Sequence, residues 1–443
     1  MTDSARETSK RRRKSCSDSE LEPSELPASN APKRPKVLMN DNQGAEKDSS
    51  MPAGASEAVS TEVVPLEDLL DLSEVLDQKD LRLQARFDTI AKALLCDYHL
   101  VVTRPGATRR LQVMELEFYF QKADLHEDPF THGSEEQKVA GRWYFHRAPR
   151  PSADANRSLT STTAWRGGTR KGLDLTLGRS PGYTSSDGDT HETLLRGGIL
   201  LRSVRVLGPN SKVISGPSLL VDEILASSGA KDIGDVVNGK WGGNVSAFPS
   251  QAVGEATPSH SLYLIPASPS AQSSGTLGGK SPTIYTSPRI GLDLSHPGTT
   301  GPSVRPLHSR LRFLGRPYRY FREPHLLTAN GRSQTFLGVV YHSAQALIEA
   351  KQGEEASSSR VNSSAESFTN TLSNSRILVN VCKITGLKEP TAHKYLEDFK
   401  AGRKGGEQVL KEFVGPSGKG AGSSPKKYLV MMGALSSLVL SDE

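Results

Sequence analysis

One stretch of the chain, residues 111–147, combines acidic, phenolic and imidazole side chains at a spacing that could do chemistry. Glu115, Glu117 and Tyr119 alternate with apolar residues, and side chains two positions apart in a strand point to the same face. Two carboxylates and a phenol would then project from one face of a strand. A loop with two histidines follows. Together such groups could hold a flat ligand and activate a water molecule beside it.

The other face of the same strand is apolar. Met114, Leu116, Phe118 and Phe120 would lie on it together and pack on a hydrophobic core. A second aromatic run, Trp143–His146, comes after the histidine loop and predicts a second strand. The alternative for this stretch is a solvated strand face that is followed by a polar turn.

The surrounding elements must position these residues. The hydrophobic periodicity predicts helices and strands in the following order. A helix is expected at 66–76, a helix that changes to a strand over 85–102, a turn at 105–107, strands at 173–177 and 197–207, a helix from 214 with Ser215 as a possible cap, strands at 287–294 and 310–321, and helices at 343–351 and 389–402. Arg202 lies within an apolar strand, so it must be paired or face a wet cleft.

Two segments suggest contact with a polyanion. The glycine-rich run at 165–178 includes Arg166, Arg170 and Lys171, which could meet phosphate groups. The run at 310–321 mixes arginines with aromatic residues, a composition that suits base stacking. A plain surface loop and an amphipathic edge strand are the respective alternatives.

Composition sets limits on the class of protein. The chain has 443 residues, of which 35% are hydrophobic and 6% aromatic, with 40 glycines and 27 prolines. This mixture predicts one folded unit of about 200–250 residues together with disordered segments. The net charge of +6 favours polyanionic partners. Three widely spaced cysteines predict neither a disulfide framework nor a cysteine-based zinc site, and no apolar run is long enough to cross a membrane.

The N-terminal residues 1–62 are expected to be a disordered tail. They contain two basic clusters that together resemble a bipartite nuclear-import signal. The basic residues of these clusters are Lys10, Arg11, Arg12, Arg13, Lys14, Lys33, Arg34 and Lys36. A generic basic tail that touches nucleic acid is the alternative. Either interpretation favours the nucleus, with an import receptor as a partner in the first case.

Several collinear segments resemble the methylpurine-DNA glycosylase family, also called alkyladenine or 3-methyladenine DNA glycosylases. The segments that carry the resemblance are IAKALLCDYHLVV (90–102), VMELEFYF (113–120), GRWYFH (141–146), GGILLRSVRVL (197–207), SGPSLLVDEIL (215–225), PRIGL (288–292) and LRF (311–313). They span roughly half the chain, and each fragment alone is a weak signal.

The resemblance implies an α+β fold, a single mixed domain around a curved antiparallel sheet. That domain is expected at 63–325, with disordered insertions near 148–164, 179–192 and 245–283. A helical C-terminal extension is expected at 326–443, with a linker near 352–375, and would serve as a packing or interaction module. The implied activity is excision of alkylated or deaminated purines from double-stranded DNA, by a monomer that needs no cofactor and no metal.

The resemblance also implies roles for individual residues. Glu117 matches the general base, and Arg202 matches the residue that orients water or a phosphate. The residues expected to bind the base are Tyr119, His132, Tyr144, His146 and Asp174. The residues expected to meet the DNA backbone are Arg166, Arg170 and Lys171. The family has tyrosine where His146 stands and asparagine where Asp174 stands. A non-catalytic nucleic-acid-binding protein on the same scaffold is the alternative function.

Overall fold

The computed structural model describes residues 64–73, 79–149, 161–181, 194–249, 258–267, 282–328, 330–354 and 375–438. These residues belong to one compact unit that extends from Glu62 to Glu443. Its fold is α+β, with an antiparallel sheet and a helical C-terminal region, as the sequence predicts. The basic clusters between Lys10 and Lys36 lie outside the described residues. None of the described helices is long and apolar enough to span a membrane.

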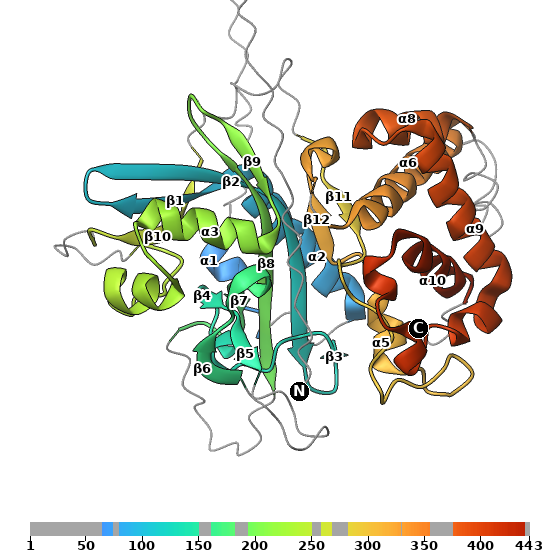
Figure 1. The fold of residues 1–443 in the computed structure, drawn as a ribbon, viewed down its shortest axis with the longest axis horizontal. Coiled ribbons are helices and arrows are strands. Elements are labelled where there is room, and N and C mark those ends of the chain that lie inside the picture. The colour runs from blue at the N-terminus through green and yellow to red at the C-terminus, as the bar shows by residue number, and fades with distance from the viewer. Residues whose placement is uncertain are drawn as a thin grey trace, which may run out of the picture. The chain divides into compact units, whose positions relative to one another are not determined.

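The centre of the fold is an antiparallel sheet that contains ten strands of the described chain (Figure 1). Its main path runs in the order β10 (Ser261–Pro266), β1 (Tyr98–Arg104), β2 (Ala107–Lys122), β8 (Leu195–Val206), β7 (Leu173–Leu177) and β4 (Trp143–Phe145). The remaining strands pair at its sides, namely β3 (His126–Glu127) and β12 (Arg319–Phe321) with β2, β9 (Lys212–Ser215) with β8, and β11 (Tyr285–Ser287) with β12. A separate two-stranded sheet joins β5 (Arg147–Pro149) to β6 (Ser161–Trp165).

Helices pack around this sheet, and those of the C-terminal region lie beside β11 and β12. The α-helices are α1 (Leu66–Leu69), α2 (Lys79–Lys92), α3 (Pro217–Ser228), α5 (Ser309–Leu314), α6 (Arg332–Glu354), α8 (Ser375–Thr385), α9 (Glu389–Lys411) and α10 (Pro425–Ser437). The π-helical segments are η2 (Ala93–Asp97) and η5 (Asp235–Lys240). The 3₁₀ turns are η3 (Glu135–Lys138), η4 (Gly168–Arg170), η6 (Pro324–Leu326), η7 (Gly415–Gly418) and η8 (Ala421–Ser423).

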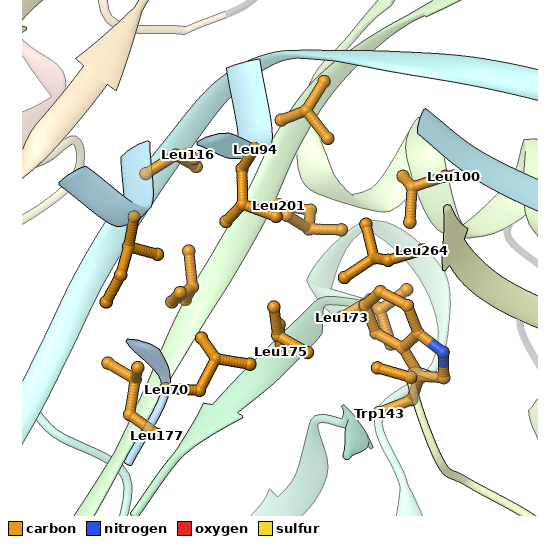
Figure 2. Close-up of a cluster of buried hydrophobic side chains, with 14 of the residues drawn as sticks. Leu70, Leu94, Leu100, Leu116, Trp143, Leu173, Leu175, Leu177, Leu201 and Leu264 are labelled. Carbon is orange, nitrogen blue, oxygen red and sulfur yellow. The ribbon is translucent and has the colours of Figure 1, made fainter. Parts of the chain in front are cut away.

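The first hydrophobic cluster fills one face of the central strands. Leu116, Leu175 and Leu201 contribute to it from β2, β7 and β8, and helix α2 adds Phe87. Figure 2 shows leucines of β2, β7 and β8 in the same cluster as Trp143 of β4. From Leu116 to Phe120 of β2 and from Ile199 to Leu201 of β8, every second side chain enters this core, as the sequence predicts.

Met114 does not share the face of Leu116, Phe118 and Phe120, and this expectation was wrong. The register between β2 and β8 shifts on both sides of Glu115, which marks a β-bulge. A bulge inserts one extra residue and changes which side the preceding side chains occupy. Met114 consequently belongs to a second hydrophobic cluster, while Val113 belongs to the first.

The second hydrophobic cluster joins the C-terminal helices to the sheet. It contains Phe336 of α6, Phe399 of α9 and Leu429 of α10 together with Met114 and Phe321 of the sheet. In Figure 1 these helices, coloured orange to red, lie together beside β11 and β12. The C-terminal region therefore shares a core with the sheet rather than extending away from it.

Two predicted strands adopt other structures. Residues 287–294 leave the sheet after Ser287, and the first part of 310–321 is helix α5, with a strand only at Arg319–Phe321. Phe313, Tyr318 and Tyr320 are buried in the first cluster, so the proposed exposed stacking surface was wrong. Strand β12 lies between β11 and β2, so it is not an edge strand either.

Other boundaries differ in ways that local chemistry explains. The helix expected at 66–76 ends at Leu69, because Asp71 forms a bridge with Gly178. The cap of α3 is Gly216 rather than Ser215, which instead ends β9. The segment Ser261–Pro266, expected to lie within a disordered insertion, pairs with β1 in the main sheet. Helix α9 continues past Gly402 to Lys411, with a kink at Gly406, where the backbone is not helical (φ 52°).

Candidate functional site

Glu117 lies among buried ionic side chains on one face of β2. Its Oε2 accepts hydrogen bonds from the hydroxyl of Tyr119 (2.8 Å) and from Arg202 Nη1 (3.2 Å). Its Oε1 accepts one from the backbone N–H of Ile290 at 2.7 Å. Glu117 is 0% exposed to solvent. These three donors therefore replace water as the solvation of the carboxylate.

Glu115 holds two arginines on the same face. Its Oε1 accepts from Arg202 Nε at 3.2 Å and from Arg319 Nε at 2.7 Å. Its Oε2 accepts from the hydroxyl of Ser203. We refer to Glu115, Glu117, Arg202 and Arg319 as the carboxylate–arginine cluster. It contains two acids and two guanidinium groups, so its formal charges balance.

Arg319 connects this cluster to the C-terminal helices. Its Nη1 donates to Ser287 Oγ at the end of β11, and its Nη2 donates to Thr335 Oγ1 of α6, each at 3.0 Å. The C-terminal region was expected to be a packing or interaction module. Through Thr335 it contributes a hydrogen bond to the residues that hold Glu115.

Charge neutralisation outweighs burial in the carboxylate–arginine cluster. Burial alone would raise the pKa of Glu115, but Arg319, Arg202 and the Ser203 hydroxyl lower it below its ordinary value. Burial alone would lower the pKa of Arg202, but the acids beside it raise it. Burial and the Glu117 charge together raise the pKa of Tyr119. Tyr119 is therefore a neutral phenol that donates to Glu117.

Glu117 and Arg202, the two predicted catalytic residues, lie side by side in the structure. The two side chains are in direct contact, and Arg202 is only 7% exposed. Tyr119 is partly exposed. Of these three residues, Tyr119 is the most exposed to solvent.

A second buried ion pair, between Arg289 and Asp128, contacts the Tyr119 ring. Arg289 donates through Nη1 and Nη2 to the carboxylate of Asp128, and through Nη1 to the carbonyl of Phe118 at 3.0 Å. The Arg289 guanidinium lies 4.5 Å from the centre of the Tyr119 ring, within the range of a cation–π contact. Arg289 lies in the segment PRIGL (288–292) and was not among the predicted site residues.

The predicted site residues lie in rows across neighbouring strands. Glu117 is opposite Leu200 of β8, Leu200 is opposite Asp174 of β7, and Asp174 is opposite Tyr144 of β4. Directly opposed residues of antiparallel strands place their side chains on the same face. Adjacent strands are about 4.8 Å apart, so the Cα atoms of Glu117 and Asp174 are separated by about 10 Å.

Gly198 occupies the next row, between Tyr119 and Thr176. A Cβ atom at this position would lie 2.8 Å from both Asp174 Oδ2 and Gln137 Nε2. Only glycine leaves these two side chains the room they use. The close approach explains a glycine inside a strand where it otherwise weakens the pairing.

Imidazole groups gather at the far end of these rows. His146 Nε2 lies 2.8 Å from Asp174 Oδ1, and Gln137 Nε2 donates to Asp174 Oδ2 at 3.1 Å. A carboxylate only accepts, so His146 carries a proton on Nε2. The His146 ring centroid is 4.5 Å from that of His132 and 6.0 Å from that of Tyr144. We refer to His132, Tyr144, His146 and Asp174 as the imidazole cluster.

His132 is neutral over most of the pH range. Burial, with smaller effects from His146 and Arg166, lowers the pKa of His132 to about 4, although Asp174 opposes the shift. A neutral imidazole offers one donor and one acceptor to a ligand. Burial likewise raises the pKa of Tyr144, which remains a neutral phenol.

Two buried polar atoms near the imidazole cluster lack a hydrogen-bond partner within the part of the chain that the structure describes. They are Gln137 Oε1 and the hydroxyl of Thr131, the residue before His132. Leaving such a group unpaired costs about 1–3 kcal/mol. A ligand edge that carries an N–H group would satisfy Gln137 Oε1. Gln137 had no place among the predicted site residues.

The loop at 166–172, which carries Arg166, Arg170 and Lys171, adjoins the imidazole cluster. His146 accepts through its carbonyl from Arg166 N–H (2.8 Å) and donates through its N–H to the carbonyl of Gly172 (3.0 Å), so both ends of the loop bond to one residue. Arg166 Nε also donates to the carbonyl of Arg147 at 2.9 Å. The predicted base-binding and backbone-binding residues are therefore neighbours.

The basic side chains of this loop differ in availability. Lys171 forms an ion pair with Asp222 of α3, which offsets its charge. Arg170 is exposed, and Arg166 is partly exposed. Arg170 is thus the side chain of the three that most freely faces solvent.

The carboxylate–arginine cluster and the imidazole cluster remain separate. Within the described ranges no hydrogen bond joins Glu117 or Arg202 to any member of the imidazole cluster. His126, the first histidine of the loop, belongs to neither cluster. It is buried, its Nδ1 lies 3.0 Å from the carbonyl oxygen of Phe120, and its Nε2 lies 2.8 Å from the hydroxyl of Tyr318. Among the residues the structure describes, no three acidic, histidine or cysteine side chains are grouped to hold a metal ion.

Comparison with known proteins gives one relative without a stated activity. No family model matches the chain. An uncharacterized protein of Acanthamoeba polyphaga mimivirus is 29% identical to it over 206 residues, which are 46% of this chain and 78% of the viral protein. The chain is similar to that protein over roughly half of its own length.

Proposed function

We propose that this protein is a DNA glycosylase-like hydrolase, which excises damaged purine bases by attack of water on the N-glycosidic bond. The observation that carries the proposal is the direct contact of Glu117 with Arg202 and Tyr119 on the sheet face that also holds the imidazole cluster. A charged acid, a cation and several rings on one face are the groups that such a reaction uses. The resemblance to methylpurine-DNA glycosylases supports the same assignment.

The proposed reaction requires one carboxylate. Glu117 accepts a proton from water as the water oxygen bonds to C1′ of the sugar. The bond from C1′ to the base nitrogen breaks, and its electron pair leaves with the base. The positive charge that develops on the sugar is stabilised by the same carboxylate. Arg202 holds Glu117 in place and balances its charge.

The imidazole cluster would hold the flipped base. Tyr144, His146 and neutral His132 offer ring surfaces and single hydrogen bonds, which suit a flat ligand with polar edges. The unpaired Gln137 Oε1 favours a base with an N–H group on its edge. Hypoxanthine, the deaminated form of adenine, has such a group, so inosine is the first substrate to test.

Access to Glu117 requires a movement of Tyr119. The Tyr119 hydroxyl donates a hydrogen bond to Glu117 Oε2, the atom that would accept the proton of a catalytic water. A base that stacks on the partly exposed Tyr119 ring would draw this hydroxyl away and admit water. The hydroxyl is thus a gate that the substrate opens.

Base release from duplex DNA tests the proposal. The full-length chain is incubated with duplexes that contain one inosine or one ethenoadenine, and abasic sites are detected by strand cleavage in alkali. Replacing the general base should slow release about 100- to 10,000-fold in Glu117→Gln. The exposed Glu135→Gln is the matched control and should keep wild-type activity. Thermal unfolding of both variants separates a lost base from a lost fold. Equal rates in wild type and Glu117→Gln would remove Glu117 from the mechanism.

The second candidate is a non-catalytic nucleic-acid-binding protein on the same scaffold. The full burial of Glu117 and the backbone amide of Ile290 on its Oε1 favour this alternative. Salt-sensitive DNA binding without abasic product from any modified purine would identify it. The nuclear location and the import receptor remain proposals that depend on residues 1–62 alone.

A further inference from the structure

A cavity of about 110 Å³ lies where the start of α6 meets the η6 turn and the loop between α8 and α9. Its lining residues are His325, Leu327, Thr328, Arg332, Thr335, Thr385, Gly386 and Leu387. They include an arginine, a histidine and three threonines, and no acidic residue. The Arg332 guanidinium, the His325 ring and the hydroxyls of Thr328 and Thr335 can donate hydrogen bonds, so the lining suits an anion, whereas Thr385 Oγ1 already donates to Val381.

Arg332 brings an unused positive charge to this cavity. It is exposed and forms no ion pair with any residue that the structure describes. It is also the first residue of α6, a helix of 23 residues without an acid in its first turn. The positive end of a helix dipole and a free guanidinium both stabilise a bound anion.

Thr335 supplies a buried hydroxyl to the same cavity. It is 5% exposed, and its Oγ1 accepts a hydrogen bond from Arg319 Nη2. Within the described chain its own proton has no acceptor. A buried donor without an acceptor points to a partner that arrives from the cavity.

The end of α8 also borders the cavity. There Thr385 Oγ1 donates to the carbonyl of Val381 (2.7 Å), and the carbonyl of Cys382 accepts from Gly386 N–H (2.9 Å).

We propose that this cavity binds a phosphate group, with Arg332 and Thr335 as its main ligands. Because a single water needs about 10–15 Å³ of such volume, the cavity has room for a phosphate whose attached group extends into solvent. The phosphate comes from a free monoester or from a nucleic-acid backbone. The inference does not depend on the glycosylase proposal, since no catalytic residue lines the cavity.

Calorimetric titration of the full-length protein tests the site. The probes are inorganic phosphate, a nucleoside 5′-monophosphate and dimethyl phosphate, a diester like the nucleic-acid backbone, all at one ionic strength. Arg332→Gln should weaken binding about ten-fold or more, because it removes a charge-assisted hydrogen bond. Arg82→Gln, at an exposed position of α2, is the matched control and should bind as wild type does.

The Thr335 variants give a second measurement. Thr335→Val should weaken binding, and Thr335→Ser, which keeps the hydroxyl, should restore most of it. Binding of inorganic phosphate and the nucleoside 5′-monophosphate, but not of dimethyl phosphate, identifies a free ligand. Binding of dimethyl phosphate identifies a backbone phosphate. The proposal is overturned if none of the three probes binds, or if Arg332→Gln binds them as tightly as wild type.

Discussion

Glu117 and Asp174 face the same side of the sheet, one on each side of Leu200. Each carboxylate has a different basic partner, Arg202 for Glu117 and His146 for Asp174. One row of the sheet therefore presents two carboxylates about 10 Å apart, one bonded to a guanidinium and the other to an imidazole.

A substitution at Gly198 tests the packing of Asp174 and Gln137 against β8 most directly. Gly198→Ala would place a methyl group 2.8 Å from Asp174 Oδ2, so the Asp174 side chain must move away from His146. Overpacking of this kind costs about 1–3 kcal/mol. Urea denaturation of the variant measures the cost. Gly167→Ala is the control, because nothing lies within 4 Å of its new methyl group. Equal stability of the two variants would show that the row tolerates a side chain at Gly198.

Glu115 should matter for stability rather than for chemistry. Glu115→Gln leaves Arg202 and Arg319 buried with one fewer negative charge, and breaking a buried pair costs about 3–5 kcal/mol. Glu127→Gln, at an exposed position of β3, should change stability by less than about 0.5 kcal/mol. Chemical denaturation of both variants measures the difference. A Glu115→Gln protein as stable as wild type would mean that the two arginines find other partners.

The alternation along β2 was sufficient to predict the strand, its buried face and the acids on the other face. It could not reveal the bulge at Glu115, since a bulge is a property of the pairing with β8 and not of the β2 sequence. Helix α5 was missed for a related reason. Its residues SRLRFL fit either structure locally, and contacts with both hydrophobic clusters, through Phe313 to the first and through Leu311 and Leu314 to the second, decide between them.

The site was predictable only in part for a similar reason. Glu117, Tyr119 and Arg202 were identified, and the structure brings them into hydrogen-bond contact. Arg289 and Arg319 are in the sequence as ordinary arginines, and their importance depends on pairing with acids more than 150 positions earlier. No local pattern encodes such long-range pairs, although burial of an arginine requires that a partner exist.

The C-terminal helices should be required for folding. A chain that ends at Glu354 loses α8, α9 and α10, which supply much of the second hydrophobic cluster around Met114 and Phe321. Exposure of that surface predicts aggregation or loss of cooperative unfolding. A chain that begins at Glu62 retains the whole compact unit and is the matched control. Size-exclusion chromatography and thermal unfolding distinguish the two. A stable, monomeric chain that ends at Glu354 would make the C-terminal helices a separate module.

His132 should make the protein less stable as the pH falls. Its pKa is about 4 in the folded protein, against an ordinary value of 6.5. Between these values the unfolded chain binds more protons than the folded one, so stability rises with pH. The contribution is complete above about pH 6.5 and is lost as the pH falls toward 4, with a total of about 2–3 kcal/mol. Urea denaturation at several pH values should therefore give a steeper slope for wild type than for His132→Gln. His393→Gln, on the exposed side of α9, is the control and should follow the wild-type slope. Parallel curves for wild type and His132→Gln would show that His132 titrates normally and is not held neutral beside His146.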